Sequence, residues 1–279
     1  MKTEYQRNNV ILSEVTAFSV SQTLECGQCF RWQKTEENTY CGIVRGKILT
    51  VSQPNEDTII LHNCSQKEFT ELWYEYFDLS FDYDAVGKEI ARRSPILYQA
   101  WQSGKGIRIL QQDSWEVLCS FIISQNNNIP RIKGIVQRLC ENFGEKIAEN
   151  RYTFPSAEKL SHYSVEDLTV LRSGFRAKYI ADACRKVAAE EVNLKEIRKM
   201  STDKARAELM KIKGVGRKVA DCTLLYGMGK KECFPIDVWI NKAIKTLLPT
   251  FRVEDFGNNA GIVQQYIYDY SRKNPNLFR

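Results

Sequence analysis

Apolar and polar side chains alternate along much of the first eighty residues, with the period of two that is typical of β-strands. Runs with this pattern are separated by turn-forming residues and cover 18–24, 30–33, 40–44, 47–52 and 58–62. Arg45-Gly46, between two of these runs, predicts a tight hairpin turn. The N-terminal part therefore predicts an antiparallel sheet with one covered face.

Beyond Ser65 the apolar residues recur every three to four positions, which predicts helices packed by one face. Ser65 and Glu68 have the spacing of a capping box at the start of the first helix. The strongest amphipathic pattern covers 132–140, and weaker ones cover 69–76, 115–122, 180–187, 238–248 and 262–270. Because no repeat or flexible linker interrupts the chain, we expect its domains to pack closely.

The composition places the chain among ordinary soluble proteins of the cell interior. It has 279 residues, 43% apolar and 27% charged, with a formal net charge of +6. That charge is compatible with a polyanionic partner without proving one. The nine cysteines are odd in number and scattered, which indicates reduced thiols rather than a disulfide framework. The N-terminus lacks the apolar core of a signal peptide, and no apolar run reaches a membrane-spanning length.

The sequence contains few motifs that could bind a metal or form a histidine-based catalytic site. Cys26 and Cys29 form a single CxxC pair without a second pair to complete a zinc site, and no four-cysteine cluster follows in the last third. His62 and His162 are the only histidines. We therefore expect no metal site and no histidine-based mechanism.

Gly214-Val215-Gly216 connects two helical patterns in the region from about 205 to 228. Glycines allow a tight turn with positive φ, and the second helix then presents its unpaired N–H groups to an anion. The same residues would also fit an ordinary turn between two helices that binds no ligand. The apolar pattern on both sides, with Val215 plugging the turn into the core, favours a phosphate-binding hairpin.

Lys218 lies in the first turn of the second helix of this hairpin. Most lysines are solvated surface residues, and this remains one reading of Lys218. The other reading is a nucleophilic amine. The helix N-terminus and the charges of Lys213 and Arg217 favour the neutral form that a nucleophile requires.

Asp237 follows Lys218 after 19 positions and precedes a predicted helix. It can serve as the N-cap of that helix. It can also stabilise positive charge on a reacting sugar and assist proton transfer. The two roles are compatible, since capping would orient the carboxylate.

Several separated motifs together resemble one enzyme family. The glycine hairpin with Lys218, and the later Asp237, resemble the helix-hairpin-helix (HhH-GPD) DNA glycosylase superfamily. Three further motifs resemble its 8-oxoguanine DNA glycosylase family, namely 27–32 (GQCFRW), 124–132 (SQNNNIPRI) and 174–179 (GFRAKY). The motifs span nearly the whole chain.

The resemblance implies an α+β fold. An N-terminal antiparallel β-sheet domain over 1–92 would pack on a two-part all-helical region over 93–279, with the active site in the cleft between domains. The enzyme would excise 8-oxoguanine, and also ring-opened formamidopyrimidine guanine, from duplex DNA opposite cytosine. We expect a monomer without cofactor, located with the genome in a bacterial cytoplasm, or in the nucleus if the source is eukaryotic.

The resemblance also implies roles around the lesion. Lys218 would form a Schiff base with the sugar, followed by β-elimination, and Asp237 would be the catalytic carboxylate. The Gly27 carbonyl would accept the N7–H that distinguishes oxidised guanine from guanine. Cys222 would lie against the flipped base, Gln264 would read its Watson–Crick edge, and Tyr268 would replace the usual stacking phenylalanine.

On the opposite strand the resemblance implies another set of contacts. Asn126 would enter the DNA, and Arg131 and Arg176 would donate to the orphaned cytosine. Phe175 would act as the wedge in place of a tyrosine. Trp239 stands where a histidine is common. Three alternatives remain. They are a glycosylase of this fold for alkylated or mismatched bases, a non-catalytic DNA-binding protein, and a protein-interaction scaffold of helices on a sheet.

Overall fold

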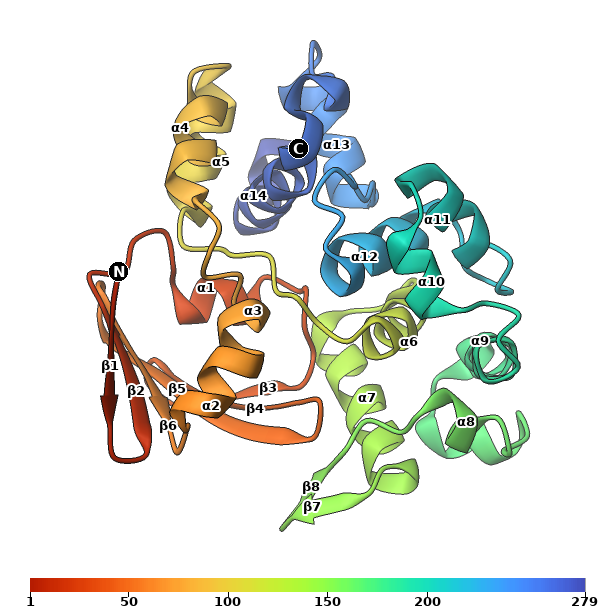
Figure 1. The fold of residues 1–279 in the computed structure, drawn as a ribbon. Helices are drawn as coiled ribbons and strands as arrows, with labels where there is room; N and C mark the ends of the chain where they lie inside the picture. The colour runs from red at the N-terminus through yellow and green to blue at the C-terminus, as the bar shows by residue number, and fades with distance from the viewer. Residues whose placement is uncertain (279) are drawn as a thin grey trace. The chain divides into compact units, whose positions relative to one another are not determined.

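Six strands form the N-terminal sheet in the order β1-β2-β6-β5-β4-β3 (Figure 1). Their bounds are β1 Lys2–Gln6, β2 Asn9–Ser13, β3 Trp32–Glu36, β4 Thr39–Val44, β5 Lys47–Asn55 and β6 Thr58–His62. Pairs β1–β2, β2–β6, β5–β6 and β3–β4 are antiparallel. This computed structural model describes residues 1–278 and confirms the predicted α+β class with an N-terminal antiparallel sheet followed by helices.

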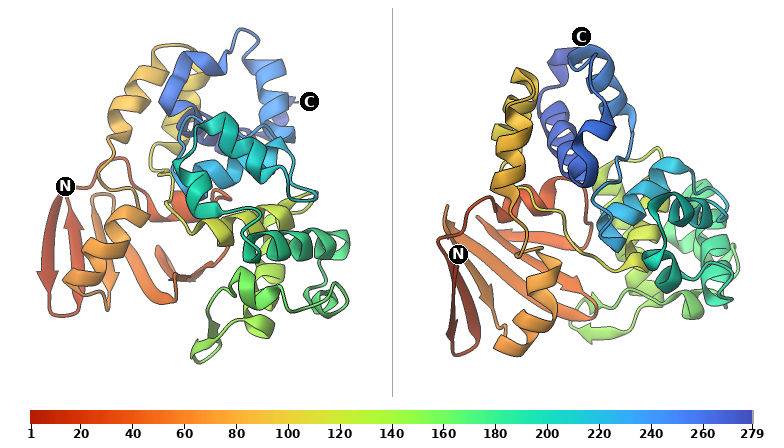
Figure 2. Two further views of the ribbon diagram at one scale, coloured as in Figure 1. Left: turned by 45° about the vertical axis from the view of Figure 1, so that its right-hand side comes forward. Right: turned by 45° about the horizontal axis from the view of Figure 1, so that its top comes forward.

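A short helical segment covers one face of the sheet (Figure 2). It runs through α2 Gln66–Glu68, the π-helix η1 Phe69–Trp73 and α3 Tyr74–Tyr76. The predicted capping box of Ser65 and Glu68 is present at its start. Trp32 of β3 packs against Trp73 and donates its indole N–H to the hydroxyl of Tyr76 at 2.7 Å. Aromatic packing therefore joins the segment to the sheet.

One predicted strand is wrong. Residues 18–24 do not join the sheet, and α1 Val20–Glu25 is a helix. Ser19 caps it by accepting the N–H of Gln22, and its buried residues Val20, Thr23 and Leu24 have helical spacing. The alternation in the sequence came from Ser19, which caps this short helix, and the half-buried Ser21 in its first turn, rather than from the two faces of a strand.

The strand predicted over 58–62 is confirmed as β6, and the other predicted strands differ only at their ends. The turn at Arg45-Gly46 is confirmed, with φ angles of 48° and 78°. β5 continues through Pro54 to Asn55, and β3 begins at Trp32 rather than Phe30. The sequence did not reveal β1 and β2, because β1 is exposed on both faces and carries no apolar alternation.

The chain divides into two compact units that do not follow a single cut in the sequence. The first comprises Met1–Gly42, Leu49–Gln111 and Lys230–Arg279, and we call it the sheet unit. The second comprises Ile43–Ile48 and Gln112–Gly229, and we call it the hairpin unit. The boundary expected after residue 92 stays a prediction.

The remaining helices of the sheet unit pack around α14 Ala260–Lys273. They are α4 Tyr83–Ala91, α5 Pro95–Gly104, α13 Val238–Leu247, η4 Val253–Asn259 and η5 Pro275–Phe278. The α14 helix contacts both α5 and α13. Since α14 also carries Gln264 and Tyr268, this packing fixes the helix on which two predicted base-contacting residues stand.

The hairpin unit is mostly helical. Its elements are α6 Ser114–Ser124, α7 Ile129–Phe143, β7 Lys146–Ala148, β8 Arg151–Tyr152, α8 Ala157–Leu160, η2 Asp167–Leu171, η3 Gly174–Arg176, α9 Ala177–Ala188, α10 Leu194–Lys199, α11 Thr202–Leu209 and α12 Arg217–Met228. The core pair is α6 and α12, with Phe121 stacked on Tyr226 at a centroid distance of 5.4 Å. Among residues 1–278, no helix is long and apolar enough to cross a membrane.

Candidate active site

The glycine hairpin joins α11 to α12 and has the conformation that its sequence predicts. Gly214 has a φ of 80°, and a Cβ there would lie 2.4 Å from the ring of Tyr179. Val215 is buried in the core, as expected from its sequence position. Glycine at position 214 therefore allows both the left-handed backbone conformation and the close packing of Tyr179 from α9.

Polar contacts from α9 fix the hairpin further. The carboxylate of Asp182 accepts the backbone N–H of Lys213 at 2.7 Å and pairs with Lys186 at 3.0 Å. Burial alone would raise the pKa of Asp182, but the Lys213 N–H and the Lys186 charge outweigh it, and the pKa is lowered. Asp182 is thus a charged anchor for the residue that precedes Gly214.

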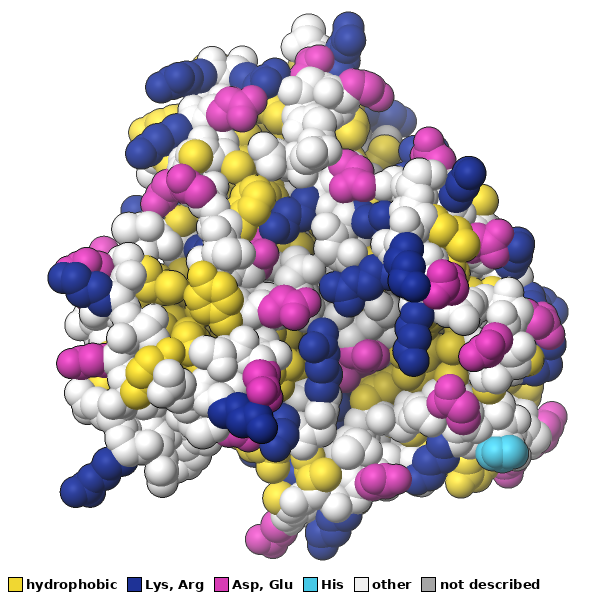
Figure 3. Space-filling view, viewed as in Figure 1, with side chains coloured by type: hydrophobic (Ala, Val, Ile, Leu, Met, Phe, Trp, Pro, Cys, Tyr) yellow, Lys and Arg dark blue, Asp and Glu magenta, His cyan; other side chains and the backbone are white. Residues whose placement is uncertain are grey.

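The N-terminus of α12 is open for an anion. Gly216 is its N-cap residue, and no side chain accepts the first N–H groups of the helix. Lys and Arg side chains gather over α10 and α12 on the face shown in Figure 3. Inside the hairpin, the buried carboxylate of Asp221 pairs with Arg206 at 2.6 Å and joins α12 to α11. A helix N-terminus near basic side chains is suited to a phosphate.

Lys218 is half-buried against α6. Its Nζ lies 3.4 Å from the hydroxyl of Ser124 and 4.9 Å from the centroid of the Phe121 ring. Cys222, one turn further along α12, is buried. The amine is therefore held by α6 rather than extended into solvent, which separates it from an ordinary surface lysine.

The asparagine turn lies between α6 and α7. Asn126 has a φ of 47° and is exposed, while Asn127 donates to the carbonyl of Ile123 at 3.0 Å. Asn128 is the N-cap of α7 and accepts the backbone N–H of Arg131 at 3.0 Å. The flanking asparagines therefore hold Asn126 at the tip of the turn, with Arg131 exposed at the start of α7.

Arg176 holds this turn by hydrogen bonds to its backbone. Its side chain is 3% exposed and donates to the carbonyls of Gln125, Asn126 and Ser173, at 2.8, 2.8 and 3.0 Å. Burial, and then the charge of Arg131, lowers its pKa. In this structure its guanidinium is occupied by the backbone of the asparagine turn.

Phe175 is exposed next to this buried arginine. Its ring is 48% exposed, stacks over the Arg176 guanidinium at 4.4 Å and meets Tyr179 edge-on at 5.8 Å. A large apolar side chain held rigidly at the surface has the form of a wedge. Direct contacts thus link Gly214, Tyr179, Phe175, Arg176 and Asn126 within the hairpin unit.

In the sheet unit, Gly27 follows α1 in a turn with a φ of 91°. Its carbonyl takes part in none of the hydrogen bonds found among residues 1–278. Gln264 on α14 is 4% exposed and donates to the carbonyl of Pro235 at 3.0 Å, while its Oε1 has no partner among the described residues. Both groups offer an acceptor to a ligand.

Tyr268 and Asp237 belong to the same unit. Burial raises the pKa of Tyr268 to about 12, aided by the charge of Asp237 and opposed by Arg272. Asp237 is the N-cap of α13 and accepts the N–H of Ile240 at 2.9 Å, so the predicted capping role is confirmed. Its neighbours Ile236 and Val238 are exposed. Capping holds the half-buried carboxylate in one orientation between two exposed apolar side chains.

Two family models match consecutive parts of the chain. The N-terminal domain of 8-oxoguanine DNA glycosylase matches residues 10–118, and the HhH-GPD superfamily of base excision DNA repair proteins matches residues 119–252.

Curated relatives agree with these models. A probable N-glycosylase/DNA lyase of Methanothermobacter thermautotrophicus is 31% identical over 77% of this chain and 78% of its own length. The chain belongs to the 8-oxoguanine DNA glycosylase family. It is a DNA N-glycosylase with lyase activity.

Solved structures match this glycosylase over almost its full length. The 8-oxoguanine glycosylase/lyase of Clostridium acetobutylicum, in complex with duplex DNA containing cytosine opposite 8-oxoguanine, is 37% identical with a TM-score of 0.92, covering 99% of both chains. MBOgg1 in complex with a low-affinity DNA ligand is 39% identical with a TM-score of 0.91, covering 98% of both chains. A 3-methyladenine DNA glycosylase of Archaeoglobus fulgidus, at 19% identity, shares the fold.

Sequence reasoning missed several residues of the glycosylase, buried or half-buried, that support the predicted site residues within their own units. Ser124 and Gln28 lie inside the recognised motifs but received no role there, and Phe121 lies one turn before the asparagine motif. Asp182 and Arg108 gave no signal, because a polar residue on a predicted helix or strand is indistinguishable from a solvated one until its partners are known.

Proposed function

We propose that this glycosylase excises 8-oxoguanine, and ring-opened formamidopyrimidine guanine, from duplex DNA opposite cytosine and then nicks the strand. The observation that carries the proposal is the placement of Lys218, whose amine is held beside Ser124 and Phe121 at the N-terminus of the anion-binding helix. The family membership supports the same reaction. We expect the enzyme where the genome is, in the cytoplasm if its source is bacterial.

The chemistry begins with the neutral amine of Lys218. It attacks C1′ of the damaged nucleotide, and the base leaves with the electron pair of the glycosidic bond and takes up a proton. The carboxylate of Asp237 stabilises the positive charge that develops on the sugar. The C1′–O4′ bond of the sugar then breaks, O4′ takes up a proton, and the lysine nitrogen and C1′ form an iminium. This iminium loses a proton from C2′, and the 3′ phosphate leaves by β-elimination. Hydrolysis of the remaining imine restores the amine, so no metal or cofactor is needed.

Recognition requires the base to leave the stack, which costs a few kcal/mol. In this proposal the Gly27 carbonyl accepts N7–H of oxidised guanine, Gln264 reads the Watson–Crick edge, and Cys222 and Tyr268 lie against the two faces of the base. Guanine has an acceptor at N7 and would place it against an acceptor, so it is rejected. The buried, unpartnered Oε1 of Gln264 supports a polar ligand at this place.

The orphaned cytosine is contacted from the hairpin unit. Asn126 and Arg131 are exposed at the turn, and Phe175 enters the stack as the wedge. Arg176 joins them by exchanging backbone carbonyls of the turn for the acceptors of cytosine. The hairpin Gly214-Val215-Gly216 holds a phosphate by its N–H groups, which provides grip without sequence preference.

Borohydride trapping tests the proposal. Reduction should convert the imine into a stable covalent adduct with a duplex that contains 8-oxoguanine opposite cytosine. Lys218→Gln should form no adduct, while Lys213→Gln, which removes a neighbouring positive charge from the same hairpin, should still form one. Absence of an adduct with the wild-type protein, or an undiminished adduct with Lys218→Gln, would overturn the assignment of the nucleophile.

The same assay defines the substrate. Duplexes with 8-oxoguanine opposite each of the four bases should give the fastest trapping opposite cytosine. A panel with formamidopyrimidine guanine, 3-methyladenine and mismatched thymine separates the proposal from its alternatives. Preference for 3-methyladenine would indicate an alkylation-repair glycosylase of the same fold.

A further inference from the structure

The side chain of Gln28 is built into the turn that presents Gly27. Gln28 is 1% exposed, and its amide nitrogen donates to the carbonyls of Thr23 at 3.0 Å and Arg108 at 2.7 Å. Its amide oxygen accepts the N–H of Leu110 at 2.9 Å. Both ends of the amide are therefore used, which fixes the side-chain orientation and the backbone next to Gly27.

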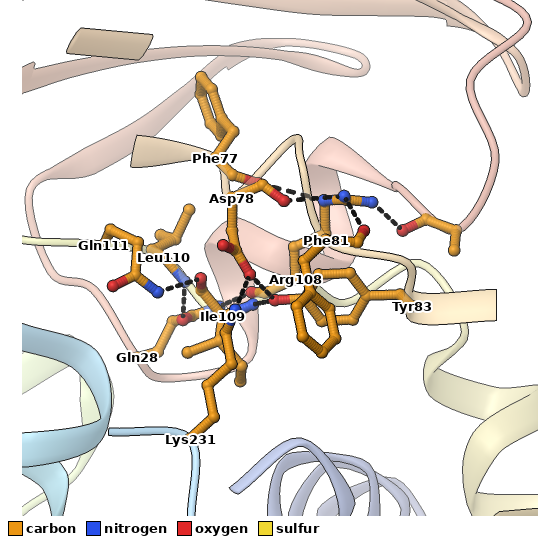
Figure 4. A network of polar contacts seen from close by, with 11 residues as sticks. Gln28, Phe77, Asp78, Phe81, Tyr83, Arg108, Ile109, Leu110, Gln111 and Lys231 are labelled. Atoms are coloured by element: carbon orange, nitrogen blue, oxygen red, sulfur yellow. Dashed lines mark hydrogen bonds and ion pairs between the residues drawn. The ribbon is translucent and has the colours of Figure 1, made fainter. Parts of the chain in front are cut away.

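The segment that Gln28 grips is itself immobilised. The guanidinium of Arg108 donates to the carbonyls of Ala17, Phe77, Asp78 and Phe81 at 2.9–3.1 Å, as Figure 4 shows in part. The backbone N–H of Arg108 also donates to the hydroxyl of Thr23 at 3.2 Å.

An ion pair extends this anchor to the C-terminal part of the sheet unit. Asp78 pairs with Lys231 at 2.7 Å and accepts the hydroxyl of Tyr83 at the same distance. Gln28 thus belongs to a hydrogen-bonded network that joins four chain segments. Its partners are held in place and cannot shift with it as a flexible loop would.

A second set of contacts holds the peptide on the other side of Gly27. The carbonyl of Cys26 accepts Nε2 of Gln265 and Nη1 of Arg272, each at 3.4 Å. Both side chains belong to α14, and Arg272 also lies over the ring of Tyr268 at 5.5 Å. The helix that carries Gln264 and Tyr268 therefore also restrains the residue before Gly27.

We infer that Gln28, opposed by Gln265 and Arg272, clamps the Gly27 peptide and thereby determines selectivity for the damaged base. The clamp fixes the direction of the Gly27 carbonyl, which has no partner of its own among the described residues. A carbonyl that could turn aside would lose the bond to N7–H and tolerate the acceptor of guanine. This inference rests on the proposed function. Gln28 acts through Gly27 and is a positioning residue.

The test compares two reactions of one variant. Gln28→Met keeps the length and volume of the side chain and removes its donor and acceptor groups. Single-turnover excision of 8-oxoguanine opposite cytosine should fall about 10- to 100-fold, the effect expected of a misplaced binding group. Cleavage of a duplex with an abasic site needs Lys218 but no contact with a damaged base, so it should stay within about twofold of the wild-type rate.

Matched variants exclude a general loss of structure. Gln53 also bridges two backbone groups of the sheet unit, donating to Phe18 at 3.0 Å and accepting from Val20 at 2.8 Å, without holding Gly27. Gln53→Met should leave the ratio of excision to abasic cleavage unchanged. If Gln28→Met fails to fold, Gln265→Leu removes one contact of the opposite side of the clamp and should lower the same ratio.

The outcomes separate the clamp from the proposed function. A wild-type protein that does not excise 8-oxoguanine contradicts the proposed function itself. A wild-type protein that does, with an unchanged ratio in Gln28→Met or in its substitute Gln265→Leu, overturns the clamp. Equal loss of both reactions in a folded variant also overturns it, because that result indicates a structural role alone.

Discussion

Asp237 and Arg176 each serve the local backbone in this structure. Asp237 caps α13 through the N–H of Ile240, and Arg176 donates to the carbonyls of the asparagine turn. Buried polar side chains require such partners, because leaving them unsatisfied costs about 1–3 kcal/mol each. The same contacts orient the side chains toward particular chemistry. Removing either side chain completely would therefore confuse loss of structure with loss of function.

Asp237→Asn separates the two roles at the residue scale. Asparagine caps a helix about as well as aspartate, so α13 should remain folded. The loss of the negative charge should lower single-turnover excision by about 10²- to 10⁴-fold, the range of acid–base contributions. Lesion binding, measured by fluorescence anisotropy, should remain within about threefold, since the change leaves the phosphate contacts in place.

Asp113→Asn is the matched control for this prediction. Asp113 caps α6 by accepting the N–H groups of Trp115 and Glu116, each at 3.0 Å. Its replacement should affect neither excision nor binding. If Asp237→Asn weakens excision and lesion binding to the same degree, the carboxylate is only a structural cap.

At the scale of elements, the glycine hairpin depends on its contact with α9. Tyr179 packs on Gly214, and Asp182 holds the N–H of Lys213. Helix propensity favours neither contact, and both require α9 to be in place first. The hairpin therefore presents its N–H groups in a fixed geometry only within the folded unit.

Gly214→Ala should destabilise this element. A left-handed backbone costs a non-glycine residue about 1–2 kcal/mol, and the added methyl would lie 2.4 Å from the Tyr179 ring, with an overpacking cost of about 1–3 kcal/mol. The free energy of unfolding, measured by urea denaturation, should fall accordingly. Affinity for undamaged duplex should also fall.

Gly216→Ser provides the comparison in the same turn. Gly216 has a φ of −93°, and no atom lies within 4 Å of a Cβ placed there. Serine is a favoured N-cap residue, so the free energy of unfolding should change by less than about 0.5 kcal/mol. If the free energy of unfolding falls equally in both variants, the contact with Tyr179 is not the reason why residue 214 must be glycine.

Local patterns predicted most elements but misassigned α1. The apolar spacing predicted α6, α7 and α9, because in these helices one face is buried along several turns. α1 has six residues, and its assignment depends on a partner far away in sequence, the carbonyl of Gly106, which accepts from Ser19 and Thr23. Such long-range bonds leave no periodic trace in the sequence.

At the scale of the whole molecule, the net charge of +6 should govern attachment to DNA. Basic side chains that neutralise phosphates release counterions, so the logarithm of the affinity should fall linearly with the logarithm of the salt concentration, with a slope of about −0.9 per phosphate contacted. Titration of undamaged and 8-oxoguanine duplexes from about 50 to 200 mM salt should give similar slopes. The affinity for the 8-oxoguanine duplex should be higher by the same factor at every salt concentration, because the contacts with the damaged base are uncharged.

The order of the chain through the molecule was not predictable. The chain leaves the sheet unit after Gln111 and returns to it at Lys230, so the return segment packs on parts of the chain more than a hundred residues earlier, such as α5. The pair Asp78 and Lys231 is one of the bonds that fix this return. Either residue alone reads as an ordinary surface charge, and only their proximity in the fold gives a reason for their burial.

The sequence by itself predicted the reaction type and its central residues through motifs that resemble one family. The spacing of the hairpin glycines, Lys218 and Asp237 left a surface lysine and a simple helix cap open as readings. Such motifs are local, and local features remain readable in a one-dimensional chain. The tertiary structure decided how these groups are supported, by Ser124 and Phe121 at Lys218 and by the Gln28 network at Gly27. Support of this kind arises from side chains that meet across large sequence separations, and their complementarity exists only once the chain has folded.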